Sequence, residues 1–558
     1  MASEPAYDPT EDESTAASAY GRMRADRDPF LQRARRMSEV TIPYLFRPEG
    51  EAGSSDELVP WNTLGAFLVF TNMGPKLTDA LFPAGIPPML LSQSAKTRAA
   101  MRAIPDPDQR ETLSTQIDAG LVQVGKDFAE CMDEDGDRGY HSIAALKLLV
   151  GGNHGFQFYQ DGTMRGISLD RFCVQRDPSG SLIEFAIEDP LSFHTLPDDI
   201  RAMVEEKGYV AAEARPKNVI CVYTWGRLRA GMWYISQEVF GAKVPGSERV
   251  LLPDALDYLF VPFILLDGED YGRSYVEMYE GDLQSVEGGT QTITEGSAAI
   301  ARFIQFVHPG GLTSKKAVEQ AANGAVLTGR AEDVTTLITN KAADFQSQQY
   351  VINSASDRLN KAFLVGSRRQ GERVTAEEIR ADIQDLQSQL GSIYSQLVVS
   401  YQAPYARLKL AALQRTKRVQ PLPKGAVKMT ILGGLAALGR SAMLNALDSL
   451  LQGTEQLFGP EAVSQALGPK SIRTYFNRRA AALGVSTDGL IPTEQEAEAA
   501  AQQQQQQALT QQVAPEAVKQ LGNNLTSTQV ADTNASAKVA TSPVAAQGDP
   551  SQQDPSQQ

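Results

Sequence analysis

The architecture of this chain depends on residues 275–306, whose sequence is YVEMYEGDLQSVEGGTQTITEGSAAIARFIQF. The pattern predicts one long helix, although it contains Gly281, Gly288, Gly289 and Gly296. Each glycine in a helix interior costs about 1 kcal/mol relative to alanine. We therefore expect this helix to persist only if packing against neighbours stabilises it, or if the glycines permit close approach. The sequence HPGG at 308–311 ends the helix sharply.

A compact unit of about 35 residues and a second helix follow. The unit has a helical pattern near 315–322 and two apolar, strand-like runs at 325–327 and 334–338. The second helix begins near Phe345, carries apolar residues at Ile352, Leu359 and Phe363, and ends at the basic, glycine-containing loop 366–373. Two long helices are therefore predicted to flank a short insertion.

The clearest local signal in the chain lies directly behind that loop. Thr375-Ala-Glu-Glu378 is a capping box, in which two side chains satisfy two backbone amides at a helix start. Apolar residues then recur at steps of three and four, at Ile379, Ile383, Leu386, Leu390, Ile393 and Leu397. This predicts a helix of about seven turns with one apolar stripe, ended by Pro404. A further helical region is predicted over roughly 432–484.

The part of the chain before residue 275 predicts an α+β arrangement, and the fold class of the whole is α+β, mainly helical. Residues 1–20 are polar and acidic and predict a loose arm. Helical spacing follows over 25–70 and again over 106–150, with a turn at 133–139. Residues 156–193 then alternate apolar and polar residues around Asp177-Pro-Ser-Gly180, a strand–turn–strand signal that 219–240 extends. The tail, with six consecutive glutamines at 502–507, is predicted to be disordered.

Composition excludes several classes of protein. Of the 558 residues 42% are apolar, so most of the chain can bury a core, and the net charge of −15 argues against a protein held on nucleic acid by a bulk positive field. Three cysteines and four histidines, all widely spaced, argue against a disulfide framework and against a zinc site. No apolar run reaches 18 residues, and the first 20 residues contain no Lys or Arg. We therefore expect a soluble, intracellular protein without a signal peptide.

Motifs for catalysis are missing from the sequence. No P-loop occurs, because Gly125-Lys126 is followed by Asp127, and neither a zinc-protease helix nor a nucleophile elbow is present. Asp133, Asp135 and Asp137 resemble the start of a calcium loop, but Arg138 and Ala144 occupy the positions that require Gly and Glu. The prediction is a solvated turn, structural histidines, and no catalytic residue, metal or cofactor.

One region departs from the acidic mean. Residues 341–420 carry 12 positive and 7 negative side chains, a local balance of +5. Two interpretations remain open for this region. It forms ordinary helix faces, or Arg368, Arg369 and Arg373 form a basic loop that touches a polyanion without gripping it. The residues by themselves indicate a multidomain α+β assembly protein without an active site.

Several sequence blocks resemble a known family. They are TIPYLF (41–46), PWNTLGA (60–66), LFP (81–83), VQRDPSGSL (174–182), LPDDIR (196–201), LDGEDYGRSYVEMYEGDLQSVE (266–287), TGRAEDV (328–334) and RRQGERVTAEEIR (368–380). No block is diagnostic alone, but in this order they resemble the portal, or head-to-tail connector, proteins of short-tailed phages of the T-odd coliphage type. The resemblance covers about residues 20–490.

The resemblance implies a phage portal fold assembled as a ring of about twelve subunits at one capsid vertex. With the arm and tail described above, its parts would be a flexible acidic arm (1–20), an α+β wing (21–275), a first stem helix (276–305), a clip (306–343), a second stem helix (344–365), a tunnel loop and wing helix (366–429), a helical crown (430–490) and a disordered glutamine-rich tail (491–558). The protein would be located in the virion, and in the host cytoplasm during assembly.

The resemblance also implies sites and partners. Double-stranded DNA would pass through the channel during packaging and ejection, past a tunnel loop formed by Gly366, Ser367, Arg368, Arg369, Gln370, Gly371 and Arg373. Terminase, and later a tail adaptor protein, would contact clip residues Thr313, Lys315, Lys316 and Arg330. Major capsid and scaffolding proteins, and internal core proteins, would be further partners, and no membrane is implied.

Two other functions compete with this interpretation. One is a capsid or tail scaffold component that assembles but never contacts DNA. The other is a hydrolase with an unfamiliar acidic site, but Glu377 and Glu378 are adjacent and point in different directions on a helix, so they cannot share one reacting atom.

Overall fold

The computed structural model describes residues 15–47, 59–83, 87–206, 219–300, 305–322, 324–336, 342–365, 389–423 and 425–431, with positions 449, 452, 453 and 456. The chain divides into two units, 1–469 with 478–484, and 470–477 with 485–558. All the described residues belong to the first unit. The predicted tunnel loop 366–373, the capping box 375–378, almost all of the predicted crown 430–490 and the tail 491–558 lie outside the described residues.

The chain enters the fold through helix α1, Ala16–Glu39. The side chain of Thr15 caps it by accepting a hydrogen bond from the Ser18 amide at 3.2 Å. The prediction of a loose arm over 1–20 is wrong for its last five residues, because Ala16, Ala19 and Tyr20 are buried and helical. The apolar side chains of this first turn pack against strands β4 (Phe172–Arg176), β5 (Leu182–Ser192) and β6 (Val219–Arg229), so the helix extends to the Thr15 cap.

Short helices, one strand and two longer helices follow. They are α2 (Leu64–Ala66), the π-helix η2 (Phe67–Met73), α3 (Gly74–Leu81), strand β1 (Met89–Gln93), α4 (Ala95–Arg102), α5 (Pro107–Glu134) and α6 (Asp137–Gly151). The predicted turn at 133–139 joins α5 to α6 through Gly136, whose φ of 69° is left-handed. Gly152, with φ 72°, ends α6, and strand β2 begins at once at Asn153.

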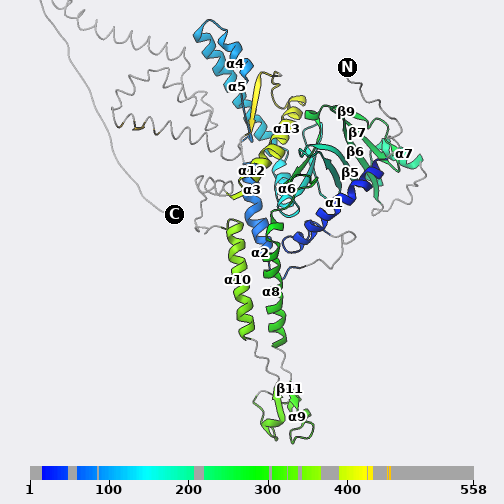
Figure 1. Ribbon diagram of the computed structural model, residues 1–558, viewed down its shortest axis with the longest axis vertical. Helices are drawn as coiled ribbons and strands as arrows, with labels where there is room; N and C mark the ends of the chain where they lie inside the picture. Colours follow the sequence, from blue (N-terminus) through cyan, green and yellow to red (C-terminus); the bar gives the residue numbers. More distant parts are fainter. Residues whose placement is uncertain are drawn as a thin grey trace, which may run out of the picture. The chain divides into compact units, whose positions relative to one another are not determined.

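Two antiparallel sheets confirm the strand predictions. The larger has the order β4-β5-β6-β7-β8, with β9 also paired to β7 (Figure 1). Its strands are β4 (Phe172–Arg176), β5 (Leu182–Ser192), β6 (Val219–Arg229), β7 (Met232–Val239), β8 (Ala242–Lys243) and β9 (Arg249–Leu251). The predicted turn joins β4 to β5, with the Gly180 amide donating to the Asp177 carbonyl at 2.8 Å. The smaller sheet has the order β10-β2-β3, from Tyr258–Pro262, Asn153–Phe158 and Met164–Ile167. Short helices η3 (Phe193–Thr195), α7 (Asp198–Glu206) and η5 (Pro253–Ala255) lie between strands.

Two long helices then flank a short insertion, as predicted. The single turn η6 (Val276–Tyr279) leads into α8 (Glu280–Ile300), and α10 (Ala342–Ala362) lies beside α8 (Figure 1). The insertion has a two-stranded sheet of β11 (Gln305–Val307) and β12 (Val334–Thr336), with α9 (Lys315–Glu319) and the single turn η7 (Ala331–Asp333) between them. The strand predicted at 325–327 is wrong, because β11 pairs with β12 and leaves 325–327 unpaired, with Val326 99% exposed.

The last described helices differ from the prediction at Pro404. Helix α12 (Ser392–Leu397) passes through a π-helix, η8 (Val398–Gln402), into α13 (Ala403–Arg415), so Pro404 does not end the helix. Proline lacks an amide donor and collides with the carbonyl one turn earlier, and the wider turn of η8 accommodates it at the start of α13. Strand β13 (Val427–Ile431) then pairs with β1. Of the predicted apolar stripe, Leu390 and Leu397 are buried.

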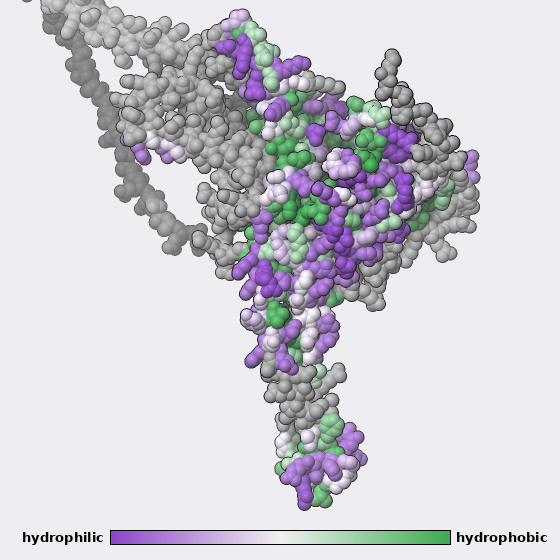
Figure 2. Space-filling model, in the orientation of Figure 1, coloured by the Kyte–Doolittle hydropathy of each residue, from purple (hydrophilic) through white to green (hydrophobic). Residues whose placement is uncertain are grey.

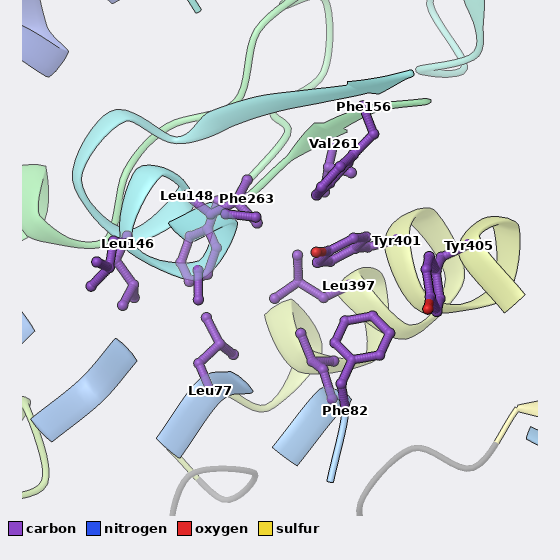
Figure 3. Close-up of a cluster of buried hydrophobic side chains, with 14 of the residues drawn as sticks. Leu77, Phe82, Leu146, Leu148, Phe156, Val261, Phe263, Leu397, Tyr401 and Tyr405 are labelled. Carbon is purple, nitrogen blue, oxygen red and sulfur yellow. The ribbon is translucent and has the colours of Figure 1, made fainter. Parts of the chain in front are cut away.

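One continuous hydrophobic core joins these segments. Figure 3 shows side chains from α3, α6, strands β2 and β10 of the smaller sheet, and the α12–α13 segment meeting there. Among them are Leu77, Leu146, Phe156, Val261, Leu397 and Tyr401. Phe82 stacks on His141 with ring centroids 3.7 Å apart, and the edge of the Tyr405 ring packs against both rings. Segments more than 250 residues apart in sequence are therefore held together by aromatic packing.

Candidate functional site

Helices α8 and α10 approach closely because two of the four predicted glycines face the partner helix. A Cβ atom on Gly289 would lie 2.7 Å from Ile352 Cγ1, and one on Gly296 would lie 2.7 Å from Phe345 Cζ. No other atom lies within 4 Å of the corresponding positions on Gly281 and Gly288. The expectation that glycines permit close approach is thus confirmed for Gly289 and Gly296, while the other two face away from this contact.

Apolar residues and one ion pair complete the contact between the two helices. Leu283 and Val286 of α8, and Ala355 and Leu359 of α10, are buried between them. At the edge, the Arg358 guanidinium donates two hydrogen bonds to the Asp282 carboxylate, at 2.5 and 3.1 Å. These hydrogen bonds lower the pKa of Asp282 below its usual value. Because the Arg358 side chain is 57% exposed, this ion pair orients the two helices and contributes little to their stability.

The C-terminal end of α10 is fixed by side chains from three other segments. Tyr275 Oη donates to the Ala362 carbonyl at 2.7 Å, and Gln389 Nε2 donates to the same oxygen at 2.9 Å. Lys76 Nζ donates to the Leu364 carbonyl at 2.8 Å, and Asn72 Nδ2 donates to the Phe363 carbonyl. The carbonyls that a helix leaves without intrahelical partners are satisfied in this way. The predicted loop residues 366–373 begin two residues after Leu364 and are not among the described residues.

In the insertion, the four predicted contact residues separate into two kinds. Thr313 is only 8% exposed, and its hydroxyl accepts from the Arg330 amide at 3.0 Å and donates to Asp333 Oδ2 at 3.0 Å. Thr313 therefore ties the insertion together internally and offers little surface to a partner. The side chains of Lys315, Lys316 and Arg330 are exposed.

The acidic turn between α5 and α6 takes part in a buried ion cluster. Lys409 of α13 is fully buried, and its Nζ lies 2.6 Å from Asp135 Oδ2 and 2.8 Å from Asp137 Oδ2. Tyr405 Oη donates to Asp137 Oδ2 at 2.7 Å, and Arg418 binds Asp135 at 2.8 Å. The prediction of a solvated turn is wrong for Asp135 and Asp137, because α13 covers the turn and supplies its counter-ion.

The two carboxylates of this cluster have opposite pKa shifts. Burial raises the pKa of Asp137, and Lys409 and Tyr405 oppose that rise only in part. Burial acts in the same direction on Asp135, but hydrogen bonds from Lys409 and Arg418 outweigh it and lower the pKa. Lys409 thus offsets part of the cost of burying the Asp137 carboxylate, while Asp135 is bound by Arg418 as well.

The buried histidines belong to the core, as predicted. His141 Nδ1 lies 2.7 Å from Tyr401 Oη, and complete burial holds the pKa of His141 well below its usual value. Burial lowers the pKa of His154 in the same way. A neutral imidazole packed among aromatic rings is a structural group with no route to a substrate.

Four of the described cations in the basic region at 341–420 pair with carboxylates from elsewhere in the chain, and one of them is the buried Lys409. Arg358 pairs with Asp282, Arg407 with Asp254 at 3.5 Å, and Arg418 with Glu134 at 2.9 Å. For these cations the interpretation as ordinary helix faces is correct. Arg368, Arg369 and Arg373, on which the other interpretation rests, lie outside the described residues.

Sequence reasoning missed the two features that fix the helices, which are the α10 end anchors and the Lys409 cluster. Asn72 and Lys76 lie nearly 290 residues from the carbonyls they bind, and no local pattern marks them. In the described part of the chain, no group of three or more His, Cys, Asp or Glu side chains is arranged to hold a metal ion. None of the helices there has the length and hydrophobicity that crossing a bilayer requires.

Comparison with known proteins identifies the family. Residues 13–491 match the family described as bacteriophage head to tail connecting protein. The chain is 34% identical to the portal protein of Escherichia phage T7 over 493 residues, which cover 87% of this chain and 89% of that protein. It is 32% identical to the portal protein of Enterobacteria phage T3, with 87% and 90% covered, and 26% identical to that of Enterobacteria phage SP6, with 76% and 80% covered.

Among solved structures, a chain in the neck of an empty GTA particle aligns over 73% of this chain and 90% of its own length, with 11% identity and a TM-score of 0.32. A TM-score at that level does not establish a common fold. The sequence matches extend across the helices, sheets and insertion described above and do not stop at one segment. The chain therefore belongs to the head-to-tail connecting family, the portal proteins of T7-type short-tailed phages, and is a component of the phage virion.

Proposed function

We propose that about twelve copies of this chain close into a ring at one capsid vertex, and that double-stranded DNA passes through the axial channel of the ring during packaging and ejection. The single observation that carries the proposal is the match to curated portal proteins over 87% of the chain. The close-packed pair α8 and α10, joined through a small insertion, supports it as a stem with a clip at its end. The ring acts as a structural conduit and carries out no catalysis of its own.

The proposed division of labour follows the segments of the chain. Residues 21–275 form the wing, 276–305 and 344–365 the stem, 306–343 the clip, 366–429 the tunnel loop and wing helix, and 430–490 the crown. The clip contacts terminase during packaging and the tail adaptor protein afterwards, through exposed cations such as Lys315, Lys316 and Arg330. Thr313 contributes by holding the clip together. Major capsid, scaffolding and internal core proteins are further partners.

The charge of the chain suits a conduit through which a polyanion slides. Strong Lys and Arg contacts along the channel would act as a brake, because each phosphate contact adds to the affinity. Twelve copies at −15 each would carry −180, which repels DNA from the walls. A few arginines at the tunnel loop, Arg368, Arg369 and Arg373, would centre the duplex through contacts that salt screens.

Electron microscopy of the purified protein tests the proposal directly. Class averages should show closed rings of about twelve subunits with an axial hole wider than a DNA duplex. Averages that show only monomers or dimers, or a ring without a through-going hole, would contradict it. Rings with a hole that is narrower than a duplex would favour the scaffold function that never contacts DNA.

A further inference from the structure

Helix α4 carries positive charge in a part of the chain that has no acidic residue. Residues 80–105 contain no Asp or Glu, and Lys96, Arg98 and Arg102 all lie on α4, in a chain whose net charge is −15. No residue of α4 is buried. Figure 2 shows hydrophilic side chains gathered over α4 and the neighbouring turn of α5. This is a strongly charged surface that the proposed channel and clip do not use.

The fold fixes this helix and adds a fourth cation to it. Thr97, Met101 and Ile104, spaced by three and four residues, form its half-buried side, so the three cations occupy the exposed remainder. Thr97 Oγ1 donates to the Ala426 carbonyl at 2.6 Å, and Ser94 Oγ donates to the Gly425 carbonyl at 2.8 Å. These bonds hold α4 against the turn that precedes β13. Lys428, two residues beyond Ala426, is exposed on β13.

We define the α4 surface as Lys96, Arg98, Arg102 and Lys428. None of the four forms an ion pair with a described carboxylate, whereas arginines of α1 pair with Glu184, Glu277 and Glu280. Of the described carboxylates near the α4 surface, Asp106 follows Arg102 by four residues in sequence and forms no ion pair with it, and two others have partners outside the surface. Asp79 pairs with Arg138 at 2.6 Å, and Asp118 accepts a hydrogen bond from Gln93 at 3.0 Å. The positive charge of the α4 surface is therefore available to an external anion.

The chemistry of the surface selects one kind of anion. Protein–protein interfaces depend on buried aromatic or large apolar anchors, and the exposed positions of α4 between the cations are alanines, Ala95, Ala99 and Ala100. Single-stranded nucleic acid is bound by stacking on aromatic side chains, and the α4 surface has none. The repeated phosphates of a duplex backbone are bound by arginines and lysines held in fixed positions, and this binding needs neither apolar anchors nor aromatic stacking.

We propose that the α4 surface binds the phosphate backbone of double-stranded DNA, without sequence preference, at a site separate from the channel and its loop 366–373. The inference depends on the proposed function in one respect, which is that a portal encounters double-stranded DNA. Four cations that neutralise four phosphates give a salt slope of about −3.6, so the affinity should fall about 150-fold between 50 and 200 mM salt.

A covalently closed circular duplex isolates this site, because a closed circle cannot thread through a preassembled ring. Binding of a relaxed closed plasmid to the full-length protein is measured by filter retention between 50 and 200 mM salt. The test variant is Lys96→Gln, Arg98→Gln, Arg102→Gln and Lys428→Gln together. The matched control removes the same charge from other surface positions, three exposed and one half-buried, with Arg22→Gln, Arg171→Gln, Lys243→Gln and the half-buried Arg201→Gln. Circular dichroism checks that both variants fold.

We expect the wild-type protein and the control to bind the circle with the steep salt slope, and the test variant to lose at least tenfold in affinity at 50 mM salt together with most of the slope. Equal loss in test and control variants, or unchanged binding by the test variant, would overturn the inference. Displacement of the circle by polyaspartate at a lower charge concentration than by unlabelled DNA would overturn it too, and would indicate an acidic protein as the partner. Failure to form rings would contradict the proposed function alone, because binding of the circle is scored whatever the oligomeric state.

Discussion

Replacing Lys409 by methionine removes the only cation that contacts Asp137 in the described structure. Asp137 is 1% exposed and would keep only the hydrogen bond from Tyr405, while Asp135 would keep Arg418. Breaking a buried ion pair by removing one partner costs about 3–5 kcal/mol, because a buried charge is left without compensation. The matched control is Arg407→Met, two residues earlier on the same helix. Arg407 is 53% exposed and pairs with a largely exposed Asp254, so its loss should cost about 0–1 kcal/mol.

Urea unfolding followed by tryptophan fluorescence measures this difference, at pH 8 and at pH 4. Without Lys409, only the hydrogen bond from Tyr405 opposes the rise in the pKa of Asp137 that burial causes, so the folded pKa lies further above the usual 3.8. The native state then binds the proton more tightly than the unfolded chain, and stability is lost as the pH rises from about 3.8 through the folded pKa. The loss of unfolding free energy in Lys409→Met, relative to the wild-type protein, should therefore be large at pH 8 and smaller at pH 4. Adding Asp137→Asn should recover much of it at pH 8. Equal midpoints for Lys409→Met and Arg407→Met at pH 8 would refute this account of the cluster.

Three further predictions follow from local geometry. Gly289→Leu should destabilise the α8–α10 pair by about 1–3 kcal/mol, because the leucine side chain would collide with Ile352. Gly288→Leu, at the adjacent position that faces open space, should be neutral or stabilising by up to about 1 kcal/mol. Urea unfolding midpoints compare the two variants, and equal effects would contradict the packing. Thr313→Val should destabilise the insertion by about 1–3 kcal/mol, and limited proteolysis within 305–336 should become faster. Lys315→Ala should leave the cleavage rate unchanged. Equal rates in the two variants would show that the Thr313 hydrogen bonds do not stabilise the insertion. Changing Arg368, Arg369 and Arg373 together to Ala should leave ring formation intact by electron microscopy and reduce the yield of packaged DNA; loss of rings instead would show that the loop is structural.

Local signals in the sequence were enough to predict most of the elements. The Asp177–Gly180 turn, the turn at 133–139 and the long helices around the insertion all depend on residues within one or two turns of each other. Predictions failed where a distant contact, or an unusual helical turn, overrode the expected local pattern. Ala16–Tyr20 is helical because α1 packs against the sheet, and the helix continues past Pro404 because a π-helix accommodates the proline.

The residues of the candidate site also divide into those that the sequence predicted and those that it missed. The sequence blocks placed the chain in its family, and the family match confirmed that placement. The sequence also named the insertion cations Lys315, Lys316 and Arg330, which are exposed. The sequence did not distinguish Thr313 from these cations, although its hydroxyl forms hydrogen bonds within the insertion. The anchors at the end of α10 could not be predicted, because Asn72 and Lys76 have no local pattern that marks their partners.

The sequence by itself determined the fold class, most of the order of the helices and strands, and the family, because each depends on the order of residues along the chain. Only the tertiary structure decided what neighbouring, similar residues do. Arg407 and Lys409 are two cations on one helix, yet one is an exposed partner of Asp254 and the other is the buried counter-ion of Asp137. Gly288 and Gly289 are adjacent, yet only Gly289 lets two helices meet. A helix turns by about 100° per residue, so a step of one or two positions moves a side chain from solvent to core, and which face is core depends on segments hundreds of residues away.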